Sequence, residues 1–170
     1  KFHLITCPTE STYEYIKSLN IVEAEKIKIL YDPVIEVIEI KKKINEKSDL
    51  EFKNYFLAAG RLTKQKNFTF LINSFFKLRK KIKDIKLVII GSGEEELKLL
   101  SLIAEHKLEK YVIMMKYKKN IFNYLSNSIF FVLTSEWEDP GFVLIEAAIC
   151  NKIILSSNVK NGPIEFIDNE

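Results

Sequence analysis

The sequence has few of the residues that would build a metal site or a disulfide framework. It contains two cysteines and two histidines among 170 residues. Cys7 and Cys150 lie far apart, and neither they nor His3 and His106 have a partner at metal-ligand spacing. No apolar run approaches the length of a membrane span, and no signal-peptide pattern opens the chain. A cytoplasmic setting with a buried, reduced Cys150 is therefore expected.

The sequence also lacks a strong charge of either sign, because 26 basic residues face 23 acidic ones. This balance neither requires nor excludes nucleic acid or an anionic membrane surface. Lysine clusters at residues 41–43, 77–83 and 116–119 are interpreted mainly as solvated surfaces, with a contact to anionic lipid as the secondary interpretation. Apolar residues make up 47% of the chain, which is enough for a hydrophobic core.

Short apolar runs alternate with segments of helical periodicity. Residues 87–90 and 129–133 are apolar throughout, which is typical of strands buried on both faces of a parallel sheet. The alternation predicts an α/β fold built on a doubly wound parallel sheet. The expected strands are residues 2–6, 26–30, 55–59, 86–90, 111–115, 129–133 and 152–155, and the expected helices are residues 9–19, 67–82, 94–106, 121–127, 142–150 and 163–167.

A domain boundary is expected between Tyr31 and Asp49. Asp32-Pro33 interrupts the preceding element, and residues 41–49 are charged and nearly featureless. The first residues resemble a strand already under way, and the last four resemble a helix cut short. Both ends predict that the sequence is a piece of a longer protein.

Ligands on a doubly wound sheet bind beyond the carboxyl ends of its strands, so each strand-to-helix turn is a candidate site. The turn after residues 55–59 carries Arg61 and Lys66, two cations suited to phosphate, although a solvated turn is the alternative. The turn at Gly91-Ser92-Gly93 lacks a third glycine and is interpreted as structural. The basic turn at residues 116–120 is interpreted as an exposed loop, with a base pocket at Tyr117 as the alternative.

Two glutamates flank the turn that follows residues 129–133. Seven residues separate Glu138 from Glu146, and Pro140-Gly141 between them opens a helix. Helix amides bind phosphate, and carboxylates accept hydrogen bonds from sugar hydroxyls. Glu146 has apolar neighbours on both sides and needs either a ligand or an ion-pair partner. For Glu138, the alternative is a solvated loop acid.

These segments occur in the order and spacing of one family. They are Gly60-Arg61-Leu62 with Lys66-Asn67, residues 87–93, the pair Glu138 and Glu146, and Gly162-Pro163 with Glu165. From about residue 56 to residue 167, the chain resembles the C-terminal, donor-binding half of a retaining glycosyltransferase of the GT-B fold, family 4 (group 1). The resemblance implies that residues 1–48 are the end of an N-terminal acceptor domain plus hinge. Residues 49–170 would be the Rossmann-like, nucleotide-sugar donor-binding domain, truncated before its final C-terminal helices.

The resemblance also implies a role for each matched position. Arg61 and Lys66 would hold the donor diphosphate and stabilise the leaving nucleotide, and Glu138 would lie beside the donor sugar as the third catalytic residue. Glu146 would bind the ribose hydroxyls. The donor-binding set is Gly60, Gly141, Phe142, Val143 and Glu146.

Four residues depart from the family pattern. Asp139 and Pro140 stand where glycine is usual, and Asp139 is suited to cap the helix with Pro140 in its first turn. Lys116 replaces a common glycine after the third strand of the domain. Trp137 replaces a frequent tyrosine and is expected to pack.

The implied function is a hexosyltransferase that moves a sugar from a nucleoside diphosphate sugar, with UDP expected, to a glycan or lipid-linked acceptor in bacterial surface polysaccharide synthesis. Retention would proceed by front-side attack. No metal is expected, since the sequence has no Asp-x-Asp. No cofactor and no nucleic acid is expected either. The full-length protein is expected at the inner face of the membrane as a secondary setting. The isolated piece should be inactive without its acceptor domain.

The alternative function is a non-catalytic nucleotide- or phosphosugar-binding module, which needs only the phosphate and ribose contacts. A flavodoxin-like receiver or redox domain shares the sheet, but the sequence has neither an acidic phospho-acceptor pocket nor a flavin loop.

Overall fold

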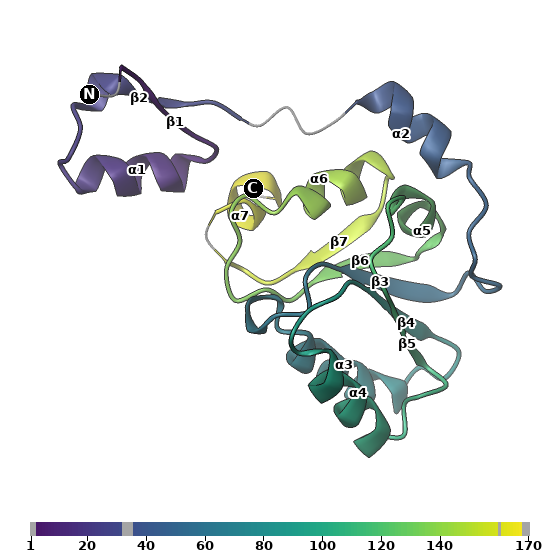
Figure 1. Ribbon diagram of the computed structural model, residues 1–170. Helices are drawn as coiled ribbons and strands as arrows, with labels where there is room; N and C mark the ends of the chain where they lie inside the picture. The colour runs from purple at the N-terminus through teal and green to yellow at the C-terminus, as the bar shows by residue number, and fades with distance from the viewer. Residues whose placement is uncertain (1–2, 32–35, 160, 168–170) are drawn as a thin grey trace.

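The computed structural model describes residues 3–31, 36–159 and 161–167 (Figure 1). The first residue of the strand expected at residues 2–6, the interruption at Asp32-Pro33 and the chain end from residue 168 lie outside the described residues. Two sheets are present: a five-stranded parallel sheet and a smaller parallel pair of strands.

The larger sheet has the strand order β5-β4-β3-β6-β7, with every pairing parallel. The prediction of a doubly wound parallel sheet is confirmed. The order reverses between β3 and β6, and ligands on such sheets bind where the order reverses. The strands are β3 (Tyr55–Ala59), β4 (Lys86–Ile90), β5 (Val112–Met115), β6 (Phe130–Leu133) and β7 (Ile153–Ser156).

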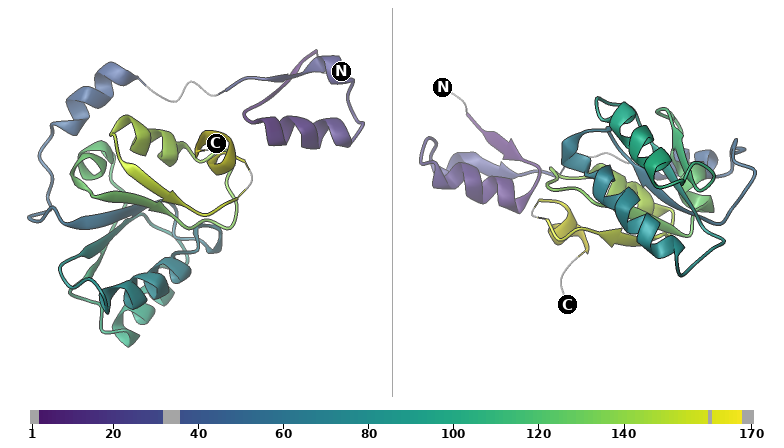
Figure 2. Two further views of the ribbon diagram at one scale, coloured as in Figure 1. Left: turned by 180° about the vertical axis from the view of Figure 1, so that it is seen from behind. Right: turned by 90° about the horizontal axis from the view of Figure 1, so that it is seen from below.

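Helices cover both faces of this sheet (Figures 1 and 2). Ala58, Leu87 and Ile89 point to one face and pack in a buried cluster with residues of α3 (Phe68–Arg79) and α4 (Glu96–Glu105). Leu57 and Val88 point to the other face and pack in a second cluster, which includes residues of α5 (Phe122–Asn127) and α6 (Phe142–Ile149). Burial on both faces explains why the central strands are apolar throughout.

One helix was not predicted. A domain boundary was expected between Tyr31 and Asp49, with residues 41–49 nearly featureless, but α2 (Val37–Ile44) extends into that stretch. Ile40 is buried in the second cluster, and the Asn120 side-chain amide donates to the Lys43 carbonyl at 2.9 Å. The three lysines at residues 41–43 made the segment look like a charged linker. It is a short amphipathic helix whose apolar side packs against α5. The division at residue 48 stays a prediction.

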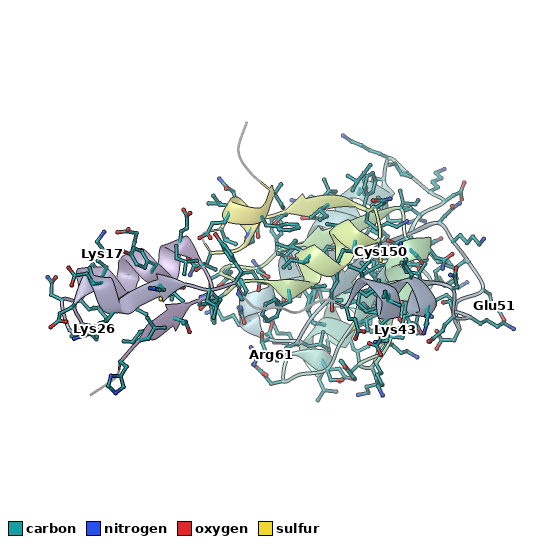
Figure 3. All side chains as sticks on the ribbon, turned by 90° about the horizontal axis from the view of Figure 1, so that it is seen from above. Lys17, Lys26, Lys43, Glu51, Arg61 and Cys150 are labelled. Carbon is teal, nitrogen blue, oxygen red and sulfur yellow. The ribbon has the colours of Figure 1, made fainter. Side chains whose placement is uncertain are left out.

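Residues 3–31 form a separate strand–helix–strand unit, in line with the strand, helix and strand expected within residues 1–30. In this unit, β1 (Ile5–Cys7) pairs in parallel with β2 (Ile27–Ile29), and α1 (Glu10–Ser18) connects them. The unit lies to one side of the larger sheet, next to the short helix α7 (Pro163–Ile167) (Figure 2). Figure 3 labels Lys17 and Lys26 on this unit.

Both cysteines are free and buried. Burial raises the pKa of the Cys150 thiol to about 11, so this thiol stays protonated and unreactive at neutral pH. The prediction of a buried, reduced Cys150 is confirmed.

Among the described residues, no helix is both long enough and apolar enough to cross a membrane.

Candidate functional site

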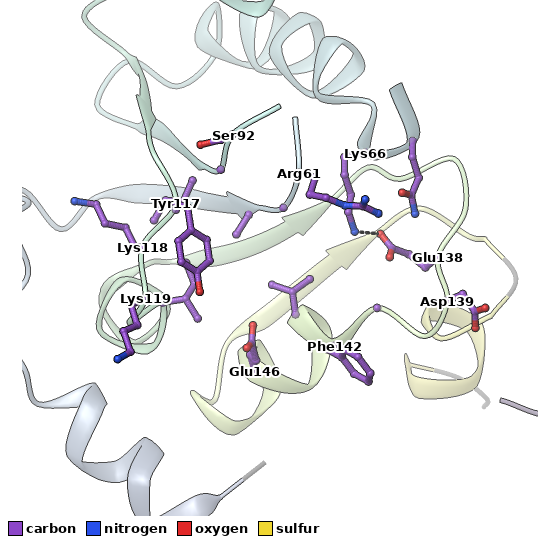
Figure 4. A pocket seen from close by; sticks show the side chains of 18 of the residues that line it. Arg61, Lys66, Ser92, Tyr117, Lys118, Lys119, Glu138, Asp139, Phe142 and Glu146 are labelled. Atoms are coloured by element: carbon purple, nitrogen blue, oxygen red, sulfur yellow. Dashed lines mark hydrogen bonds and ion pairs between the residues drawn. The ribbon is translucent and has the colours of Figure 1, made fainter. Parts of the chain in front are cut away.

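A cleft of about 530 Å³ opens beyond the carboxyl ends of β3, β4 and β6, where the strand order reverses (Figure 4). All of the sequence-predicted site residues line this one cleft, although they come from turns far apart in the chain. They are Gly60, Arg61, Lys66, Glu138, Gly141, Phe142, Val143 and Glu146. Their roles in binding stay predictions, but their convergence is a structural fact.

The glycines after β4 shape the turn that carries Arg61. A Cβ atom at Gly91 would lie 1.9 Å from the Gly60 carbonyl oxygen, and one at Gly93 would lie 2.4 Å from the Leu62 carbonyl oxygen. The Leu62 amide also donates to the Ser92 carbonyl at 3.0 Å. Only glycine allows this close approach of backbone to backbone. The structural interpretation of Gly91-Ser92-Gly93 therefore fits the observed packing.

Lys66 and Glu138 form an ion pair, with 2.5 Å between Lys66 Nζ and Glu138 Oε1. The Ser135 hydroxyl donates to the same carboxylate oxygen. The Glu138 side chain is 4% exposed and the Lys66 side chain 12% exposed, so the alternative of a solvated loop acid at Glu138 is wrong. Sequence analysis did not anticipate this pair, since the partners are 72 residues apart and meet only because β3 and β6 are adjacent.

Further hydrogen bonds hold the Lys66 turn against the Glu138 turn. The Gln65 side-chain amide donates to the Trp137 carbonyl at 2.9 Å, and the Glu136 amide donates to the Gln65 carbonyl at 2.8 Å. The Thr134 hydroxyl donates to the Lys66 carbonyl at 3.1 Å. The two sides of this part of the cleft are thus fixed before any ligand binds.

Arg61 differs from Lys66 in its surroundings. It lies on the turn directly after β3 and is exposed at the edge of the cleft (Figures 3 and 4). In the part of the chain that the structure describes, its guanidinium has no hydrogen-bond or ion-pair partner. Its five N–H donors are therefore open to a ligand anion.

The start of α6 corrects one sequence prediction. The N-cap is Gly141, in the left-handed conformation with φ of +83°, and the first helical residue is Phe142. Asp139 was expected to cap the helix with Pro140 in its first turn, but both precede the N-cap. Within the described residues no side chain caps α6, so its first amides face the cleft with their partial positive charge.

Asp139 instead faces the strand–helix–strand unit. Its carboxylate accepts a hydrogen bond from the Thr12 hydroxyl at 3.5 Å. The left-handed turn at Gly141 directs the chain into α6 and leaves Asp139 pointing away from the helix amides.

Glu146 lies on α6, one turn from its start, and is half-buried. Among the described residues, no side chain donates a hydrogen bond or supplies an ion pair to its carboxylate. Burial raises the pKa of Glu146, which indicates a carboxylate that is poorly solvated and uncompensated. The alternative of a structural ion pair is not realised in the described residues, and the carboxylate can accept two hydrogen bonds from a ligand.

The turn after β5 contributes residues that sequence analysis assigned to an exposed loop. Tyr117 is 74% exposed, as expected, yet it lines the cleft together with Lys118 and Lys119. Lys118 pairs with Asp49 at 2.6 Å, and the Tyr124 hydroxyl donates to the same carboxylate, so both lower the pKa of Asp49.

Trp137 is a second residue whose setting differs from the expectation. It was expected to pack, but its side chain is 57% exposed and lines the cleft. The only sequence signal that Trp137 would line the cleft was its position directly before Glu138.

The described residues contain no group of three His, Cys, Asp or Glu side chains arranged to hold a metal ion.

Two cations, a helix start and a carboxylate, the last two without a side-chain partner among the described residues, thus surround one cleft at the reversal point of a doubly wound sheet. This arrangement defines an α/β domain whose site suits an anionic ligand with hydroxyl groups. The family model described as "Glycosyl transferases group 1" matches residues 36–170, well over half of the chain. The chain therefore belongs to the group 1 glycosyltransferases.

Two relatives agree with this family. The chain is 33% identical over 150 residues to the Campylobacter jejuni N-acetylgalactosamine-N,N'-diacetylbacillosaminyl-diphospho-undecaprenol 4-alpha-N-acetylgalactosaminyltransferase, covering 88% of this chain and 40% of that protein. It is 36% identical over 117 residues to the amylovoran biosynthesis glycosyltransferase AmsD of Erwinia amylovora, covering 69% of this chain and 33% of that protein. The chain thus spans well under half the length of these relatives.

A solved structure shares the fold. The pneumococcal O-GlcNAc transferase GtfA, in complex with UDP and GlcNAc, matches with a TM-score of 0.80 at 22% sequence identity. The match covers 98% of this chain and 32% of that chain. The fold of this chain is that of a GT-B glycosyltransferase half.

Proposed function

We propose that the chain is the nucleotide-sugar donor-binding part of a retaining, family 4 glycosyltransferase of the hexosyltransferase type. The observation that carries this proposal is the convergence of Arg61, Lys66 and the start of α6 on one cleft. The same cleft holds the carboxylate of Glu146, which has no side-chain partner among the described residues. A nucleoside diphosphate sugar has both chemistries that this cleft complements: a doubly charged diphosphate and a vicinal diol on its ribose.

The diphosphate would lie between Arg61, Lys66 and the amides of Phe142 and Val143. Breaking the bond between sugar and phosphate leaves negative charge on the departing nucleotide, so fixed cations and helix amides lower the barrier. Lys66 carries three N–H donors and can bind a phosphate oxygen while it keeps its bond to Glu138. Glu138 would face the donor sugar, and Glu146 would accept hydrogen bonds from the ribose. With two cations at this position, the reaction would need no divalent metal.

The donor nucleotide is proposed to be UDP. The fold match to a transferase solved with UDP and GlcNAc supports this choice. The acceptor is proposed to be a glycan or a lipid-linked sugar in bacterial surface polysaccharide synthesis, bound through a separate N-terminal domain. The names of the Campylobacter and Erwinia relatives support this setting. The full-length protein would work in the cytoplasm, at the inner face of the membrane.

The test is UDP binding and sugar transfer by the full-length protein, with Glu138→Gln as the variant. Glutamine keeps the shape of Glu138 and an acceptor for the Ser135 hydroxyl but loses the charge. Transfer should fall at least about a hundredfold while UDP still binds. A non-catalytic nucleotide-binding module would bind UDP equally well with and without the substitution and would show no transfer in either protein. Absence of UDP binding in the unmodified protein would overturn both functions.

A further inference from the structure

The carboxylate of Glu165, on α7, bonds to the start of a helix that lies more than 150 residues earlier in the chain. Its two oxygens accept hydrogen bonds from the backbone amides of Glu10 and Ser11, each at 3.1 Å. Glu165 lies in the segment that resembles the family pattern, but the proposed donor site makes no use of it. Among the described residues, Glu165 is not part of the lining of the donor cleft.

Glu165 supplies hydrogen-bond acceptors to the two amides at the start of α1 that have none within the helix. The N-cap Thr9 accepts from the Thr12 amide at 3.1 Å, and the Thr9 carbonyl accepts from the Tyr13 amide at 3.1 Å. The amides of Glu10 and Ser11 would remain without acceptors in α1 itself, since one hydroxyl cannot serve three donors. A charged acceptor at a helix start also gains from the helix dipole. Thr9 is 2% exposed, whereas Glu10 is exposed and Ser11 is half-buried, so only part of this helix start is enclosed by protein.

The other side of this contact is the loop that carries Glu138. A Cβ atom at Gly162 would lie 1.6 Å from the Pro140 carbonyl oxygen, so the residue directly before α7 packs closely against Pro140. Asp139 of the same loop accepts a hydrogen bond from the Thr12 hydroxyl. The start of α1 therefore touches the Glu138 loop by two routes, one through Glu165 and one through Asp139.

We propose that Glu165 is a positioning residue that fastens the strand–helix–strand unit to the loop of the donor cleft. The inference rests on the proposed function, in which this unit belongs to the acceptor side of the enzyme. Glu165 would hold the acceptor side over the donor sugar, and breaking its two bonds would let the acceptor side move away. The diphosphate site itself would be unchanged, because Glu165 contacts none of Arg61, Lys66 or Glu146.

The first test compares Glu165→Gln with the matched control Glu14→Gln in the full-length protein. Glu14 is an exposed carboxylate on α1, the helix that Glu165 contacts, and its partner among the described residues is Lys17. Glutamine at position 165 keeps one neutral acceptor, so kcat for transfer should fall about tenfold, the effect of losing one helix cap. UDP affinity and the donor KM should stay within about twofold of wild type. An unchanged kcat, or an equal fall in UDP affinity, would overturn the proposal.

A second variant leaves Glu165 in place. Proline at the first helical position is well tolerated, and Thr9 before it already has the extended conformation that a following proline requires. Glu10→Pro therefore removes one amide donor to Glu165 without breaking α1. Its kcat should also fall, and its effect should not add to that of Glu165→Gln. Full additivity would show that the two changes act separately and would contradict the contact.

Amide hydrogen exchange separates this inference from the proposed function. The Ser11 amide should exchange faster in Glu165→Gln than in wild type or Glu14→Gln, whether or not the protein transfers sugar. If wild type neither binds UDP nor transfers sugar, the proposed function fails while the exchange result still decides the contact. Unchanged Ser11 exchange in Glu165→Gln would exclude the contact in solution.

Discussion

Replacing Glu146 with glutamine should stabilise the ligand-free protein while weakening its affinity for UDP. The Glu146 side chain is half-buried on α6, and within the described part of the chain nothing donates to its carboxylate. Burial raises the pKa of Glu146, so the folded state disfavours the ionised form. Glutamine has nearly the same shape without the charge. The free energy of unfolding should rise by about 1 kcal/mol at neutral pH, which is typical when a destabilising residue that is kept for function is replaced.

The pH dependence fixes the sign of this effect. The folded-state pKa of Glu146 is raised above its ordinary value of 4.5, so the contribution of Glu146 to stability is fully present below that pH. This contribution is lost as pH rises through the raised pKa, because the unfolded chain ionises more easily than the folded one. Glutamine does not titrate. The advantage of Glu146→Gln should therefore vanish under acid conditions and reach its full value at neutral pH.

The effect on binding should have the opposite sign. In the proposed site, the Glu146 carboxylate accepts two hydrogen bonds from the ribose hydroxyls. Glutamine keeps one acceptor and loses the charge. Hydrogen bonds to charged groups contribute about 2 kcal/mol, which corresponds to a roughly 30-fold increase in the Kd for UDP.

Thermal unfolding across the acid-to-neutral range and UDP titration by calorimetry measure the two effects on the same variant. The control is Glu105→Gln, an exposed carboxylate near the end of α4, whose loss should change stability by less than about 0.5 kcal/mol and leave UDP binding intact. A Glu146→Gln protein that is less stable at neutral pH and binds UDP normally would refute the reasoning, since Glu146 would then have a partner within the protein.

Three further predictions concern the turns around the cleft. Lys66→Ala should weaken binding of UDP more than binding of uridine, because only UDP carries the diphosphate; equal losses in parallel titrations would contradict the phosphate role. Lys66→Met should destabilise the protein by about 3 kcal/mol in urea unfolding, because it leaves the buried Glu138 carboxylate without its cation. Adding Glu138→Gln to that variant should restore part of the loss, and no recovery would argue against the ion pair. Gly93→Ala should cost at least about 2 kcal/mol, because its Cβ would lie 2.4 Å from the Leu62 carbonyl oxygen; an unchanged urea midpoint would exclude that close packing.

Elements buried on both faces were predictable from the sequence. The strands at residues 55–59 and 86–90 agree in both bounds with β3 and β4. Apart from Lys86 at the start of β4, their side chains are apolar, which leaves a pattern that a single sequence records. The strand-to-helix turns followed from the same reasoning, because parallel strands end at one edge of the sheet. The structure places Arg61, Lys66, Glu138 and Glu146 in the lining of one cleft, and their roles in binding stay predictions.

Features that depend on long-range contacts were not predictable in this way. The helix α2 depends on the burial of Ile40 against α5, and its lysine-rich sequence hides the apolar side. The position of Asp139 depends on the left-handed turn at Gly141, since an aspartate before a helix normally suggests a cap. The pair between Lys66 and Glu138 depends on strand order, which composition and periodicity do not specify.

The ion pair between Lys66 and Glu138 explains how a cleft with so much charge stays ordered without a ligand. A buried lysine or a buried glutamate alone would be costly, whereas the pair is neutral and the Ser135 hydroxyl supports it. Lys66 has N–H donors left for a phosphate oxygen, so a diphosphate can bind without breaking the pair. Arg61, exposed and without a partner among the described residues, would then supply the additional positive charge. Two of the three side chains proposed for catalysis, Lys66 and Glu138, thus hold each other in position beforehand, and little rearrangement is needed when charge develops on the leaving group.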